Sequence, residues 1–200
     1  MKTPSPYQKT KEQWLKDGFN HYLAKQYQQA IADFNRAIQL DPQYAIAYSN
    51  RGSVYAELEK YQQAIADFNR AIQLDPQYAK AYSGRGSVYA DLNQYQQAIA
   101  DCNRAIQLDP QFTEVYINRG VAYRRLNKYQ QAIADYDRAI QLDPQQTIAY
   151  ILRGNVYAEL EKYQQAIADF NRAIQLDPHN PDATYWRELR EQAQQRFQGR

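Results

Sequence analysis

The side chains that most often carry catalysis are scarce in this chain. Its 200 residues include two histidines, His21 and His179, and a single cysteine, Cys102. A nucleophilic cysteine needs a base and an orienting group beside it, and the sequence around Cys102 offers neither. No glycine-rich phosphate loop, HExxH pair or calcium-binding loop occurs. We therefore expect no enzymatic activity, no cofactor and no metal site.

Charged side chains recur at a fixed spacing of 34 residues. Arginines stand at four equivalent places, and so do aspartates sixteen residues after them. Carboxylates that recur identically suit a structural role better than they suit one unique acid–base pair. We predict four ion pairs, which are Arg51–Asp67, Arg85–Asp101, Arg119–Asp135 and Arg153–Asp169.

The same period of 34 residues organises most of the chain. The runs YQQAIAD and RAIQLDP each occur five times. A fixed period of this kind marks a repeat array, in which each unit buries its apolar face against its neighbours. The predicted copies are residues 11–44, 45–78, 79–112, 113–146 and 147–180.

Each copy has the pattern of two helices. In the second copy, 45–57 forms the first helix, and 62–74 forms the second, with apolar residues at the spacing of a buried helical face. Asp75-Pro76 ends the second helix, because proline cannot continue the hydrogen-bond ladder. Short links make neighbouring helices antiparallel, so the sequence predicts an all-α fold.

Glycine recurs at the eighth place of every copy, as Gly18, Gly52, Gly86, Gly120 and Gly154. Glycine inside a helix is less favourable than alanine by about 1 kcal/mol, so five equivalent glycines predict the close approach of another helix. The expected facing residues are the alanines of the second helix, which are Ala30, Ala64, Ala98, Ala132 and Ala166.

Composition and the two ends of the chain give the remaining expectations. A net charge of +2 gives no electrostatic footprint for nucleic acid. No apolar run is long enough for membrane insertion, and the start MKTPSPYQKT lacks the apolar core of a signal peptide, so we expect a cytoplasmic protein. Residues 1–10 are predicted to be a flexible tail, and 181–200 a capping helix and tail that cover the last copy.

The spacing of seven residues in the second copy resembles the tetratricopeptide repeat. These residues are Tyr48, Gly52, Tyr55, Ala64, Phe68, Ala71 and Pro76. The resemblance implies an α-solenoid, a right-handed superhelix of antiparallel helix pairs whose concave face is lined by the first helices. The chain departs from the family pattern where arginine or, in the first copy, aspartate replaces a leucine.

The copies differ from one another mainly in their first helices. The resemblance places these differences on the concave groove, so we predict that a partner protein or peptide binds there. The predicted groove residues are Leu15, Phe19, Tyr22, Asn50, Ser53, Lys80, Ser87, Ile117, Asn118, Val121, Arg124, Ile148, Ile151, Leu152 and Asn155. Ile117, Ile151 and Leu152 either pack between adjacent first helices or form an exposed apolar patch for the partner.

These features favour a non-enzymatic scaffold or adaptor that binds a peptide or a helix of a partner protein. The alternative is a structural module that self-assembles into homo-oligomers through its groove, its tail or its end cap. The carboxylate clamp by which some family members grip chaperone tails is not expected. Only Asn50 and Lys80 match its five places in copies one to three, where Leu15, Phe19 and Gly84 occupy the others.

Overall fold

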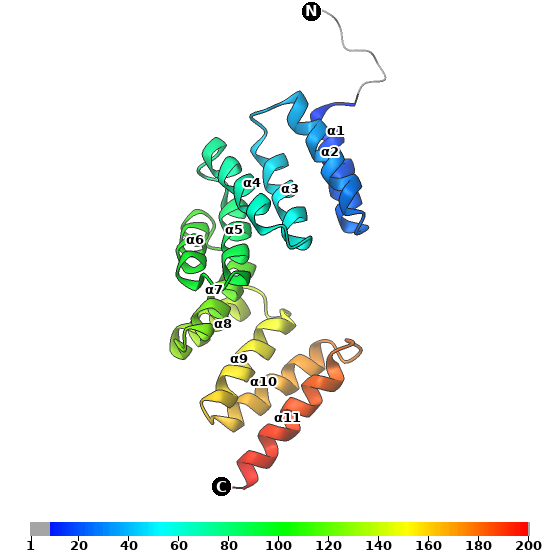
Figure 1. Ribbon diagram of the computed structural model, residues 1–200. Coiled ribbons are helices and arrows are strands. Elements are labelled where there is room, and N and C mark those ends of the chain that lie inside the picture. Colours follow the sequence, from blue (N-terminus) through cyan, green and yellow to red (C-terminus); the bar gives the residue numbers. More distant parts are fainter. Residues whose placement is uncertain (1–8, 200) are drawn as a thin grey trace, which may run out of the picture. The chain divides into compact units, whose positions relative to one another are not determined.

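A computed structural model describes residues 9–199 of the chain. In that range it contains eleven α-helices and no strand (Figure 1). The helices are α1 (Lys11–Leu23), α2 (Tyr27–Leu40), α3 (Ala45–Glu57), α4 (Tyr61–Leu74), α5 (Ala79–Asp91), α6 (Tyr95–Leu108), α7 (Thr113–Arg125), α8 (Tyr129–Leu142), α9 (Thr147–Glu159), α10 (Tyr163–Leu176) and α11 (Ala183–Gln198). None of these helices is both long and apolar enough to cross a membrane.

The helix ends follow from local sequence. At the end of α4, Asp75 takes an extended conformation ahead of Pro76, as expected for a residue that precedes proline. Between α3 and α4, Glu59 has a left-handed backbone with φ of 56°. The equivalent residues of the other copies share this conformation, so all five links make the same turn; they are Lys25, Asn93, Asn127 and Glu161.

The predicted tail at residues 1–10 lies mostly outside the described residues. Its last two residues are described and are tied to α1. The Thr10 side chain accepts a hydrogen bond from the Gln13 backbone, and the Gln13 side chain accepts one from the Thr10 backbone. This capping box satisfies two of the free backbone donors at the start of α1.

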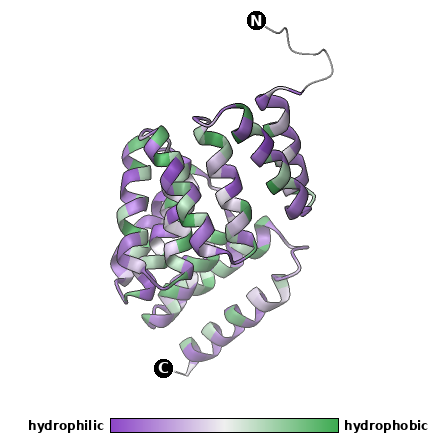
Figure 2. Cartoon of the chain, turned by 45° about the horizontal axis from the view of Figure 1, so that its top comes forward, coloured by the Kyte–Doolittle hydropathy of each residue, from purple (hydrophilic) through white to green (hydrophobic). Residues whose placement is uncertain are grey.

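The helices fall into two compact units, and each is described by itself. The N-terminal unit (Met1–Gln94) contains α1 to α5, and the C-terminal unit (Tyr95–Arg200) contains α6 to α11. Each unit includes two complete helix pairs, and Figure 1 shows the two helices of each pair running antiparallel. Most helices carry both hydrophobic and hydrophilic residues along their length (Figure 2), as expected when one face is buried.

The second helix of a pair supplies the centre of each packing layer. In the N-terminal unit, Ala64, Phe68 and Ala71 of α4 are buried together with Ala81 and Val88 of α5. Because α4 also packs against α3, it lies between the first helix of its own copy and that of the next. Each copy therefore completes the core of its neighbour.

The close approach predicted at the recurrent glycines is confirmed where the structure describes it. The prediction of facing alanines is wrong at three of these glycines, because an aromatic ring of the second helix lies there. A Cβ atom on Gly120 would stand 2.6 Å from the Tyr136 ring, and one on Gly18 or Gly154 would meet the equivalent phenylalanine. At Gly52 the contact is looser, with the Phe68 ring at 3.2 Å and the Ala64 carbonyl oxygen at 3.3 Å.

The last helix covers the end of the C-terminal unit. Ala183, Trp186 and Ala193 of α11 are buried in one cluster with Phe170 and Ala173 of α10. The opposite side of α11 is exposed and mainly polar. Trp186 is thus a packing residue of the terminal helix.

The unequal glycine contacts lead to a prediction about stability. Gly120→Ala should destabilise the chain by about 1–3 kcal/mol, because the new methyl group overlaps the Tyr136 ring. Gly52→Ala is the matched control. Its nearest contacts exceed 3 Å, so the helix propensity gained, about 1 kcal/mol, should offset most of the strain. Urea unfolding of both variants measures the difference, and equal losses would contradict this packing.

Candidate partner-binding faces

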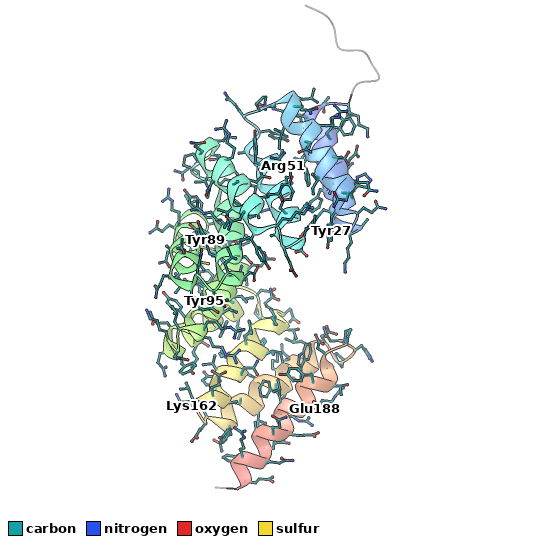
Figure 3. The ribbon with its side chains drawn as sticks, in the orientation of Figure 1. Tyr27, Arg51, Tyr89, Tyr95, Lys162 and Glu188 are labelled. Atoms are coloured by element: carbon teal, nitrogen blue, oxygen red, sulfur yellow. The ribbon has the colours of Figure 1, made fainter. Side chains whose placement is uncertain are left out.

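A half-buried arginine joins neighbouring helices at each described inter-repeat junction. In the N-terminal unit, Nε and Nη2 of Arg51 donate to the two carboxylate oxygens of Asp67, each at 2.7 Å. Nη1 of Arg51 donates to Asn35 Oδ1, which belongs to α2 of the preceding copy. Arg51 is labelled in Figure 3. One guanidinium on a first helix therefore bonds to the second helices of two successive copies.

The same arrangement recurs in the C-terminal unit. Arg119 donates to Asp135 at 2.8 and 2.6 Å and to Asn103 at 2.6 Å. Arg153 donates to Asp169 at 2.8 and 2.6 Å and also to Asp137. Three of the four predicted ion pairs are thus confirmed, and the Arg85–Asp101 pair stays a prediction.

Tyrosine rings lie against these arginines, and partial burial affects the pKa values of Arg119 and Asp135. The Arg51 guanidinium carbon lies 5.5 Å from the centre of the Tyr48 ring and 5.9 Å from that of Tyr55. Burial lowers the pKa of Arg119, but the hydrogen bonds to Asp135 outweigh it and raise that pKa overall. Burial raises the pKa of Asp135, which Arg119 only partly offsets. These guanidinium groups are half-buried and already donate to carboxylates within the structure, so they are poorly suited to partner recognition.

The cysteine and the first histidine each have a structural setting. Cys102 is buried in the core, and burial raises the pKa of its thiol to about 12. His21 Nδ1 lies 2.6 Å from a carboxylate oxygen of Asp33. In the first copy this histidine therefore contacts the recurrent aspartate, while Asp17 occupies the place of the recurrent arginine. Within residues 9–199, no group of three or more histidine, cysteine, aspartate or glutamate side chains could hold a metal ion.

The N-terminal unit carries seven of the predicted groove residues on its first helices. Phe19 and Lys80 are exposed, and the others are half-buried; these are Leu15, Tyr22, Asn50, Ser53 and Ser87. Leu15 and Tyr22 pack against the cluster formed by Ala30, Phe34 and Val54.

The C-terminal unit carries the other eight on α7 and α9. Ile117 and Ile151 are buried, with 8% and 5% of their surface exposed, which favours the packing interpretation of these two residues. Ile148 is 45% exposed. The others are half-buried; these are Asn118, Val121, Arg124, Leu152 and Asn155.

Arg124 is engaged within the C-terminal unit. Its Nε donates to Glu159 Oε1 at 3.0 Å, and its Nη2 donates to the same oxygen. Glu159 is the last residue of α9, so this ion pair links the first helices of two successive copies. The Glu159 carboxylate is neutralised in place.

An apolar patch is exposed on α1 in the N-terminal unit. Phe19 is 47% exposed and Leu23 is 64% exposed, and the two residues lie one helical turn apart. The Tyr22 ring lies beside Phe19, with 6.4 Å between the ring centres. Exposed apolar side chains gathered on one helix are a common mark of an interaction site.

Two carboxylates of the same unit were missed from the sequence. Glu57 is the last residue of α3 and Asp91 the last residue of α5, and both are exposed. Partial burial and the neighbouring Glu57 charge raise the pKa of Asp91. Burial, followed by the Glu57 charge, also raises the pKa of Tyr22 on α1. The sequence held a signal for both carboxylates, because they stand at the thirteenth place of their copies, one of the places where first helices differ.

The fold and these faces define a class of protein, a tandem array of antiparallel helix pairs with differing first helices. Four family models match the chain. Three are described as "Tetratricopeptide repeat" and match residues 45–78 and 79–112, 102–134, and 121–194, and one described as "TPR repeat" matches 21–59. Together these matches extend from residue 21 to residue 194. The chain belongs to the tetratricopeptide repeat family.

Solved structures of similar fold agree with this assignment. The "MamA protein" is 23% identical with a TM-score of 0.69, over 88% of this chain and 94% of that chain. TTC0263, "a thermophilic TPR protein" from Thermus thermophilus, is 19% identical with a TM-score of 0.76, over 94% and 99%. YrrB, "a TPR protein with an unusual peptide-binding site", is 23% identical with a TM-score of 0.66, over 88% and 90%. At these identities the likeness concerns the fold. No curated protein matches the chain in sequence.

The bridging arginine leads to a second prediction. Arg51→Lys should destabilise the chain by about 1–3 kcal/mol, because lysine cannot reproduce the paired bonds to Asp67 together with the bond to Asn35. Arg36→Lys is the matched control, since the exposed Arg36 makes a single bond to Gln39 and its replacement should change stability by less than about 0.5 kcal/mol. Thermal or urea unfolding decides between them. Equal losses of stability in Arg51→Lys and Arg36→Lys would show that the bridge contributes no more to stability than an exposed hydrogen bond.

Proposed function

We propose that this chain is a non-enzymatic scaffold that binds a segment of a partner protein on the exposed faces of its first helices. The supporting observation is the difference between the two kinds of helix. Second helices repeat almost unchanged along the sequence, and their recurrent residues are used in packing and in the arginine bridges. First helices differ between copies mainly at residues that packing leaves exposed or half-buried, although their fifth place is buried in four copies.

The proposed contact residues lie on one kind of helix in both units. In the N-terminal unit they are Phe19, Tyr22, Leu23, Asn50, Ser53, Lys80 and Ser87. In the C-terminal unit they are Asn118, Val121, Ile148 and Asn155. Ile117 and Ile151 are left out because they are buried, and Arg124 because it is paired with Glu159. Leu15 and Leu152 are assigned to the supporting core, since both pack against buried clusters.

The comparison with YrrB supports the same kind of function, because that protein is described as having a peptide-binding site on this fold. A fold alone hosts many functions, so the proposal depends on the exposed residues of this chain. Phe19 and Leu23 are the strongest of these. Large apolar side chains near the centre of an interface commonly contribute most of the binding energy.

Selection from a random-peptide phage library on the whole chain tests this proposal. Selected peptides should lose about 2 kcal/mol of binding free energy, roughly 30-fold in affinity, with Phe19→Ser, Leu23→Ser or Ile148→Ser, according to the unit they use. Leu40→Ser is the matched control, because Leu40 is 58% exposed but ends a second helix. Leu40→Ser should bind the selected peptides with the same affinity as the unaltered chain.

Two results would contradict the proposal. One is a library that yields no specific peptide. The other is a set of peptides that bind equally well to all three first-helix variants but more weakly to Leu40→Ser.

A further inference from the structure

We infer that the C-terminal ends of α1, α3 and α5 form a docking surface for a basic segment that carries an apolar residue. This inference rests on the proposed function and adds the chemistry of the partner. Phe19 and Leu23 provide an apolar contact surface for that residue. Glu57 and Asp91 provide the charge that selects lysine or arginine beside it.

The apolar side chains and the carboxylates belong to neighbouring helices that share one surface. Phe19 lies beside Tyr22, and α3 packs against both α1 and α5. Glu57 at the end of α3 lies within interaction range of the Tyr22 hydroxyl. Glu57 in turn acts on Asp91 at the end of α5. Asp91 also raises the pKa of Tyr61 after the larger effect of burial. Three first helices of the N-terminal unit therefore contribute to a single face.

Among the described residues, neither carboxylate has a cationic partner, although Glu57 lies within interaction range of the Tyr22 hydroxyl. A helix C-terminus carries a partial negative charge, so an acidic last residue is unfavourable there. Glu57 and Asp91 each end a helix, and they lie close enough for their charges to repel. Among residues 9–199, no ion pair engages either carboxylate.

The C-terminal unit handles the same places differently. The last residue of α7 is Arg125, a favourable charge at a helix C-terminus. The last residue of α9 is Glu159, which Arg124 neutralises. The uncompensated negative charge is thus a feature of the N-terminal unit, and it accompanies the most exposed apolar side chain named on any helix, Leu23. Residues that reduce local stability without structural gain are often kept for function.

A basic partner segment would offset the charge repulsion at the helix ends and cover the exposed apolar side chains. Its ammonium or guanidinium groups would pair with Glu57 and Asp91 and would complement the negative helix ends. Its apolar residue would cover Phe19 and Leu23. An acidic segment would meet repulsion from both carboxylates, so the surface discriminates by charge as well as by shape.

Fluorescence anisotropy with two designed peptides tests the inference on the whole chain. One labelled peptide is a short amphipathic segment of lysines and leucines, and the other has glutamate in place of every lysine. The lysine peptide should bind saturably and at least about tenfold more tightly than the glutamate peptide. Its affinity should fall as salt is raised, because screening weakens these exposed charges.

Variants then locate the binding. Glu57→Gln and Asp91→Asn should each weaken the lysine peptide several-fold, and Phe19→Ser should weaken it about tenfold. Glu188→Gln and Tyr185→Ser on α11 are matched controls of the same chemistry and exposure, and they should leave the affinity unchanged. Asp91→Asn should also melt at a temperature equal to or above that of the unaltered chain, because it removes a repulsive charge. Weaker binding with undiminished stability separates a docking role from a structural one.

The outcomes separate this inference from the function on which it rests. If library peptides bind the first helices but the lysine and glutamate peptides bind alike, the inference is wrong and the scaffold function stands. If the lysine peptide binds equally to Glu57→Gln, Asp91→Asn and Glu188→Gln, its attraction is non-specific and the inference is also wrong. If no peptide of any kind binds, both fail.

Discussion

The arginine bridge is the interaction on which the arrangement of neighbouring copies depends. Arg51 on α3 bonds to Asp67 on its own second helix and to Asn35 on the preceding one, so three helices meet at a single guanidinium. A planar group with five fixed donors restrains the helices more closely than apolar contact alone. The second helices are constrained by this bridge and, in α2, α4, α8 and α10, by an aromatic ring that contacts a glycine of the first helix. One face of the first helices is left free to differ.

Much of the fold follows from the sequence, because period, glycine and proline act locally. The predicted helix 45–57 matches α3, and 62–74 differs from α4 only in its start at Tyr61. The pairing of Arg51 with Asp67 was predictable, since both recur with the same period. The bond to Asn35 was not, because an asparagine on a second helix looks like an ordinary surface residue until the next first helix lies against it. Likewise, sequence indicated close approach at Gly120 but not the Tyr136 ring that faces it.

The candidate faces were harder to predict, because exposure depends on neighbours. Ile117 and Ile148 both occur on first helices and are equally apolar, yet one is buried and the other is 45% exposed. Glu57 and Asp91 are separated by a whole copy, and each alone looks like a solvated charge at a helix end. Only the packing of α3 beside α5 brings their charges together, and within residues 9–199 neither carboxylate is paired with a cation. Acidic residues at the C-terminal ends of α3 and α5 lower the stability of those helices, and such locally unfavourable residues are typical of binding sites.

The most direct test of this account is a map of backbone amide chemical shifts as the lysine–leucine peptide is added to the isotope-labelled chain. The account predicts that perturbed amides cluster at the C-terminal ends of α1, α3 and α5, around Phe19, Glu57 and Asp91. Amides of α2 and α4 away from their ends should remain unchanged, because those helices serve packing. Shifts centred on the second helices, or spread evenly over the basic and acidic surface, would contradict the division of roles between the two kinds of helix.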